Sequence, residues 1–146
     1  MGDLGLLAQE LIDSVRTGNA RLDTAFCKAM TSRDVDGALR CFLDAPDLVV
    51  VLYGSVLHGP AALRQSLTDL FSRVTTVHCE INKIKYWTAG ETVFAVGNAT
   101  YHFGAPDGSQ SILEECWTDA RQKVGGRWVY ILVHTTQVPS FCGGIS

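Results

Sequence analysis

The chain has 146 residues, of which 47% are hydrophobic and 18% charged, and its formal net charge is −3. This length supports one domain with a core, and two full-sized domains are not expected. Because no basic run is longer than a pair, nucleic acid and anionic membrane surfaces are not expected partners. The longest strongly apolar run, Leu48 to Tyr53, is far shorter than the roughly 18 residues that a membrane span needs. We therefore expect a soluble protein.

The five cysteines are odd in number, widely spaced and never arranged as C-x-x-C. Neither a disulfide scaffold nor a zinc ribbon is therefore indicated. The N-terminus has no Lys or Arg before Arg16, so no secretory signal is predicted. A reducing cytoplasm is the expected location.

The first third of the chain has apolar residues spaced three and four apart, which is typical of amphipathic helices. One helix is predicted over residues 4–15, with Asp3 as its cap and Gly18 as its end. The same spacing recurs over residues 22–30 and 35–43. Three helices are therefore expected to open the chain.

Two short strands are predicted next, over residues 48–53 and 56–58, with a turn at residues 54–55. Proline is suited to the first turn of a helix. Gly59-Pro60 therefore predicts a fourth helix, whose apolar face extends to Val74.

The rest of the chain has a period of two, which is typical of half-buried strands. The predicted strands cover about Thr75–Trp87, Thr92–Phe103, Ser111–Lys123 and Arg127–Val138. Helices first and hairpin-linked strands last indicate an α+β fold, with the helices on one side of an antiparallel sheet. The chain is expected to form one domain, with residues 141–146 as a flexible tail.

Three motifs and their order identify a family resemblance. They are Asp34-Val35-Asp36-Gly37-Ala38-Leu39 followed by Phe42, Gly54 to Gly59 followed by Ala62-Leu63, and Gly125-Gly126-Arg127-Trp128 leading to His134. In this order, from about Leu22 to Pro139, the chain resembles the SnoaL-like and ketosteroid-isomerase-like branch of the nuclear-transport-factor-2-like superfamily. The resemblance implies a cone-shaped curved sheet wrapped against helices, a cavity open at the wide end, and a homodimer through the sheet. Residues 1–18 would then be an additional helix.

The last strand departs from the pattern that the resemblance implies. The family typically has two histidines there, spaced by one residue, whereas this chain has His134 followed by Thr136. The role of the family's second histidine therefore cannot be carried over, because Thr136 stands at its position.

Hairpin geometry predicts which side chains share a face of the sheet. A four-residue turn at residues 105–108 and a two-residue turn at 125–126 would pair Asn98 with Glu115 and Trp117 with His134. The resulting candidates are Glu115 and His134 as catalytic residues, and Tyr53, Asn98, Trp117 and Thr136 as substrate-binding residues. The opposite face, which is small and apolar, would pack under helices or against a second subunit.

Apolar walls with a few polar groups are typical of a pocket for a small apolar organic ligand. Ketosteroid-isomerase-like enzymes combine a carboxylate base with hydrogen-bond donors to an enolate. If the domain is an enzyme, we expect isomerisation, cyclisation or dehydration by proton transfer, with Glu115 and His134 as acid or base. No cofactor is expected because the sequence has no glycine-rich phosphate loop, and no metal is expected because it has no H-E-x-x-H motif. Two alternatives stay open. The polar face is the wet side of the sheet, with Glu115, Asp119 and Arg121 in water, or the domain is a non-catalytic module for ligand binding or subunit association. A register slip of one residue would invert the face assignment.

Overall fold

The computed structural model describes residues 2–138, and the predicted tail at residues 141–146 lies outside them. The first element, α1 (Gly2–Thr31), is one helix of 30 residues, so the prediction of two helices separated at Gly18 was wrong. A Cβ at Gly18 would lie 2.7 Å from Cδ1 of Trp128. Glycine is therefore present here because the Trp128 ring packs closely against the helix, and the chain continues as a helix through it.

The next helix is shorter than predicted. Asp34 caps α2 (Val35–Leu39) by accepting a hydrogen bond of 2.9 Å from the backbone N–H of Gly37. The helix ends early because the following residues pair with the last strand: the N–H of Leu43 donates to the carbonyl of Tyr130 at 2.8 Å. These sheet-like bonds replace the predicted helical turn.

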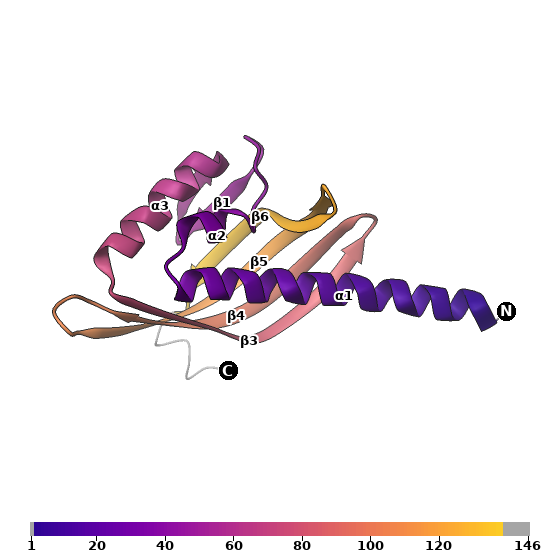
Figure 1. The fold of residues 1–146 in the computed structure, drawn as a ribbon, viewed down its shortest axis with the longest axis horizontal. Helices are drawn as coiled ribbons and strands as arrows, with labels where there is room; N and C mark the ends of the chain where they lie inside the picture. Colours follow the sequence, from indigo (N-terminus) through magenta and orange to yellow (C-terminus); the bar gives the residue numbers. More distant parts are fainter. Residues whose placement is uncertain (1, 139–146) are drawn as a thin grey trace.

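The remaining elements follow the predicted order. They are β1 (Val49–Leu52), β2 (Ser55–His58), α3 (Gly59–Arg73), β3 (Thr76–Ala89), β4 (Thr92–Gly104), β5 (Gln110–Val124) and β6 (Arg127–Gln137). The six strands form one sheet in the order β2-β1-β6-β5-β4-β3. All neighbours are antiparallel except β1 and β6, which are parallel. The sheet is curved and unclosed, and α1 crosses one face while α3 lies beside β1 and β2 (Figure 1).

The predicted register was wrong by one residue in both long hairpins. Gly104 pairs with Gln110, so the β4–β5 loop has five residues, and Ala99 rather than Asn98 faces Glu115. The side chain of Asp107 tightens this loop by accepting hydrogen bonds from the N–H and hydroxyl of Ser109.

The β5–β6 hairpin begins with the predicted two-residue turn but contains a bulge. Arg121 pairs with Tyr130 and Ala120 pairs with Leu132, so Ile131 is the extra residue. A bulge of this kind shifts every later pair by one. His134 therefore faces Thr118, on the opposite side of the sheet from Trp117 and Glu115.

The core lies between the helices and the concave face of the sheet. Its buried members include Leu22 and Phe42 from the N-terminal part, Leu63 from α3, and Val77 and Ala99 from the sheet. No helix in the described part of the chain has the length and apolar character that crossing a membrane requires.

Candidate functional site

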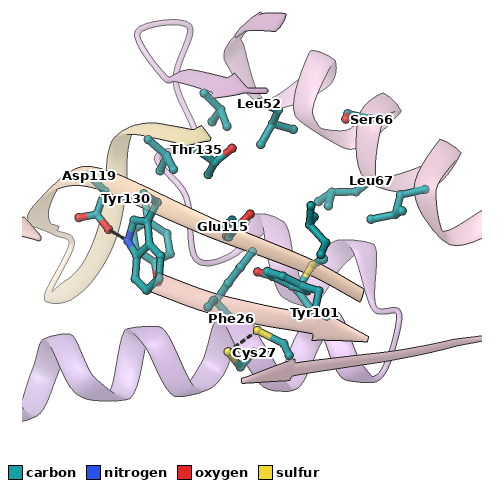
Figure 2. A pocket seen from close by; sticks show the side chains of 18 of the residues that line it. Phe26, Cys27, Leu52, Ser66, Leu67, Tyr101, Glu115, Asp119, Tyr130 and Thr135 are labelled. Atoms are coloured by element: carbon teal, nitrogen blue, oxygen red, sulfur yellow. Dashed lines mark hydrogen bonds between the residues drawn. The ribbon is translucent and has the colours of Figure 1, made fainter. Parts of the chain in front are cut away.

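A cavity of about 220 Å³ opens between α1, α3 and the concave face of the sheet. Most of its wall is apolar, with Phe26, Leu67 and Leu113 as examples, and its polar groups are few (Figure 2). This combination of apolar walls and a small number of polar side chains is typical of small-molecule sites.

Glu115 extends from β5 into this cavity and has 6% of its surface exposed. Tyr53, in the turn between β1 and β2, reaches the same cavity, and its hydroxyl donates a hydrogen bond to Oε2 of Glu115. The backbone of Tyr53 has a φ of 49°, a left-handed conformation that residues other than glycine rarely adopt. The fold thus holds a strained tyrosine against a buried carboxylate, and such strain gathers at functional sites.

Burial raises the pKa of Glu115 above its ordinary value, because an apolar wall disfavours the charged carboxylate. The hydrogen bond from Tyr53 acts in the opposite direction and is the weaker effect. Burial, followed by the charge of Glu115, raises the pKa of Tyr53 far above the physiological range, so its hydroxyl stays protonated. Glu115 therefore keeps its proton to a higher pH than an exposed glutamate does, while Tyr53 remains a donor.

A second polar cluster lies along the cavity towards α1, centred on Arg121. This side chain is fully buried and donates to two carboxylates, with Nε at 2.8 Å from Oδ1 of Asp119 and Nη2 at 2.8 Å from Oδ1 of Asp23. The hydroxyls of Tyr86 and Tyr130 each donate to Asp23 at 2.6 Å. Asp23 and Asp119 both line the cavity.

Burial and hydrogen bonding act in opposite directions on the charged groups of this cluster. Burial disfavours the charged guanidinium of Arg121, but hydrogen bonds with Asp119 and Asp23 outweigh it and raise the pKa of Arg121 further. Burial raises the pKa of Asp119 and outweighs its hydrogen bonds with Arg121 and Trp117, which act in the opposite direction. Asp119 also accepts a hydrogen bond of 2.9 Å from Nε1 of Trp117, which fixes the indole ring in the cavity wall (Figure 2).

The structure brings together three of the six predicted site residues. Glu115, Tyr53 and Trp117 line the cavity. His134 and Thr136 are exposed on the other face of the sheet, so the prediction that His134 shares a face with Glu115 and Trp117 was wrong. Asn98 is also on that face, half-buried, and its Oδ1 has no hydrogen-bond partner among the described residues. The one-residue slip in each hairpin explains all three displacements.

The alternative in which Glu115, Asp119 and Arg121 face water is contradicted, because all three are buried. The predicted apolar face is divided between the two sides of the sheet. Ala95 and Ala99 are covered on the concave side, whereas Cys116 is exposed on the convex side.

The sequence analysis missed the Arg121 cluster and Tyr101. The signal for Asp119 and Arg121 was present, because they continue the period-two line of Glu115 and Trp117 along β5. The signal for Asp23 was its place between Leu22 and Phe26 on the apolar stripe of α1. Tyr101 was hidden by the wrong register.

Residues 24–131 match the family model described as a SnoaL-like domain. Similar solved structures include a nuclear transport factor 2-like superfamily protein from Salmonella enterica, at 10% identity and TM-score 0.81, covering 88% of this chain and 94% of that chain. A candidate dehydratase of this fold family from Streptomyces avermitilis has 16% identity and TM-score 0.80, with 88% and 99% covered. A hexachlorocyclohexane dehydrochlorinase has 13% identity and TM-score 0.75, with 94% and 90% covered.

At these identities the structural likeness establishes the fold alone. No curated protein matches the sequence. The predicted α+β fold and the predicted family resemblance are both confirmed. Among the side chains that the structure describes, in residues 9–138, no three His, Cys, Asp or Glu are grouped so that they could hold a metal ion.

Proposed function

Because this chain belongs to the SnoaL-like domain family, we propose that its cavity binds a small, mostly apolar organic molecule and transfers a proton on it without a cofactor. The reaction class is isomerisation, cyclisation, dehydration or a related elimination. The observation that carries the proposal is the buried Glu115 carboxylate, hydrogen-bonded to Tyr53 inside an apolar cavity. A cavity of about 220 Å³ is below the usual range for drug-sized ligands, which favours a small substrate.

In this mechanism Glu115 is the base that takes a proton from carbon. Desolvation makes the carboxylate a stronger base than one in water, and removing its charge by protonation relieves the burial penalty. The negative charge that develops on the substrate needs a neutral donor. Tyr101 lines the same cavity, and burial and the charge of Glu115 raise its pKa, so its hydroxyl stays protonated and available to donate.

The proposal is tested by exchange of carbon-bound hydrogen. Purified protein is incubated in D₂O with a panel of cyclic ketones and enones, and deuterium incorporation is followed by NMR. Glu115→Gln is expected to lower the rate by about 100-fold or more. The matched control is Glu114→Gln, because Glu114 is adjacent in β5 but exposed on the convex face. Equal rates for Glu115→Gln and the wild type would remove Glu115 from the mechanism.

A second function, subunit association, is favoured by the convex face of the sheet. Phe94, Val96 and Leu132 lie there with 43%, 45% and 47% of their surfaces exposed. A second copy of the chain, docked through this face, would cover them and give a homodimer. The cone would then serve as an association module whether or not its cavity is catalytic.

This second function is tested by light scattering after size-exclusion chromatography. Val96→Lys is expected to reduce the mass from dimer to monomer. Val124→Lys is the control, since Val124 is similarly exposed at 47% but lies beside the β5–β6 turn. A monomeric wild type would contradict the homodimer and leave the test of Glu115 unaffected.

A further inference from the structure

Two cysteines meet in the wall of the cavity. The Sγ atoms of Cys27 in α1 and Cys79 in β3 are 2.6 Å apart, although the residues are 52 positions apart in the chain. Both line the cavity, and Figure 2 marks the contact between their sulfurs with a dashed line. A disulfide bond is about 2.05 Å long. The two sulfurs therefore need to approach by only about half an ångström to form one.

The contact between Cys27 and Cys79 is held in place by two packed secondary-structure elements. Cys27 lies within the last two turns of α1, and Cys79 lies near the start of β3, two elements that pack against each other. Neighbouring core residues on both elements, Met30 and Val77, are 4% exposed and fix this packing. The sulfurs therefore face each other because of the fold, with no mobile loop between them.

We propose that Cys27 and Cys79 form a redox-active pair that closes to a disulfide across the cavity wall when a peroxide reaches it. A cytoplasmic location, expected from the sequence, would keep the pair reduced at rest. The described cysteines outside the pair are placed differently. Cys41 is buried and donates to the carbonyl of Gly37, and Cys116 is exposed on the convex face.

The chemistry balances with hydrogen peroxide as the oxidant. Cys79 loses its proton, and its thiolate attacks one peroxide oxygen. The O–O bond breaks to give a sulfenic acid and hydroxide, and the hydroxide takes up the released proton to become water. The Cys27 sulfur then attacks the Cys79 sulfur, gives up its proton and displaces hydroxide, which leaves as water. In total two thiols lose two protons and two electrons, and one peroxide becomes two waters.

The surroundings favour Cys79 as the sulfur that reacts first. A hydrogen bond from Cys27 lowers the pKa of Cys79, and the same contact raises the pKa of Cys27. A hydrogen bond from Tyr101 lowers the pKa of Cys79 as well. The charges of Asp23 and Glu115 act in the opposite direction and disfavour negative charge on one or other sulfur. The shared proton between the sulfurs offsets this effect at Cys79.

The test is peptide mapping of the full chain before and after a small molar excess of hydrogen peroxide. Free thiols are alkylated under denaturing conditions, and the protein is digested with trypsin without reduction. Cys27 lies in the tryptic peptide 22–28 and Cys79 in 74–83. Peroxide is expected to convert both into one cross-linked species that is two hydrogen atoms lighter than their sum and that a thiol reductant separates.

A thermal readout accompanies the mapping. The cross-link closes a long loop, so the melting temperature of the oxidised wild type is expected to rise by about 5–10 °C. Cys27→Ser should abolish both the cross-link and this rise, whereas Cys116→Ser should keep both. Full alkylation of Cys27 and Cys79 after peroxide, or linkage of either one to a different cysteine, would overturn the proposal. The mapping uses the wild type, so this result does not depend on a variant folding.

Discussion

The cavity holds buried carboxylates in two settings, and their surroundings differ. Asp23 and Asp119 share one guanidinium, and between them they also accept hydrogen bonds from Tyr86, Tyr130 and Trp117. Within the part of the chain that the structure describes, Glu115 has no cationic partner and one neutral donor, Tyr53. Both settings are buried, so burial alone does not mark the reactive group. What distinguishes Glu115 is that its charge is poorly compensated, which leaves its proton exchangeable.

The largest effect is expected from removing the charge that compensates the cluster. Arg121→Met leaves two buried carboxylates unpaired, and breaking a buried ion pair costs about 3–5 kcal/mol of unfolding free energy. Urea unfolding measures this loss. The control is Arg64→Met: Arg64 also contacts a carboxylate at 2.8 Å, that of Asp36, but both side chains are more than half exposed. Arg64→Met is expected to lose less than about 1 kcal/mol of unfolding free energy. Equal losses in Arg64→Met and Arg121→Met would contradict a special role for the buried ion pairs.

The next largest effect is a difference in stability between two tyrosine variants, one at the Arg121 cluster and one at Glu115. Tyr130→Phe removes a hydrogen bond to the buried Asp23 carboxylate and is expected to cost about 1.5–3 kcal/mol. Tyr53→Phe removes a similar bond from Glu115, but Tyr53 is 46% exposed and its backbone is strained. Its cost is expected to be under about 1 kcal/mol. If Tyr53→Phe lost more unfolding free energy than Tyr130→Phe in the same assay, the hydrogen bond to Glu115 would be the more important one for stability, contrary to this expectation.

A smaller effect concerns the pH dependence of stability. The folded-state pKa of Glu115 is raised, so its contribution to stability is fully present below the unfolded pKa and is lost as pH rises through the folded pKa. Glu115→Gln resembles the protonated form at every pH. It is therefore expected to be about as stable as the wild type in acid and more stable than the wild type in mild alkali, where the wild-type carboxylate is charged. Parallel stability curves from pH 4 to pH 8 would count against a raised pKa.

The smallest effect is a shift in the pH profile of catalysis. The hydrogen bond from Tyr53 lowers the pKa of Glu115, so Tyr53→Phe should raise it further. If Glu115 is the base, the acid limb of the rate profile should then move to higher pH. The measurement is the deuterium-exchange rate across pH. An unmoved limb would separate Tyr53 from the proton transfer.

The positions of the strands along the chain and of helix α3 could be predicted because they depend on local signals. Gly59-Pro60 marked the start of α3, and the period of two in the last half of the chain matched β3 to β6. Glu115 and Trp117 were found for the same reason, since alternation along one strand does not depend on its neighbours.

The rest of the site depends on register, which the sequence specifies less directly. Ser109 is one residue more in the β4–β5 loop than predicted, and Ile131 is a bulged residue in β6. Each shifts the pairing with β5 by one residue, so the side chains of β4 and of the later part of β6 point to the opposite face from the predicted one. These shifts place Tyr101 in the cavity and His134 outside it. The continuity of α1 was also beyond a local reading, because Gly18 faces Trp128, a residue from the far end of the chain.

We infer that Glu115 is a buried carboxylate without adequate charge compensation, and the proposed mechanism depends on this property. The most direct measurement is an NMR titration of its side-chain carboxyl carbon, assigned by comparison with Glu115→Gln. We expect a midpoint above the ordinary glutamate value of about 4.3, and a still higher midpoint in Tyr53→Phe. A midpoint at or below that ordinary value would contradict it.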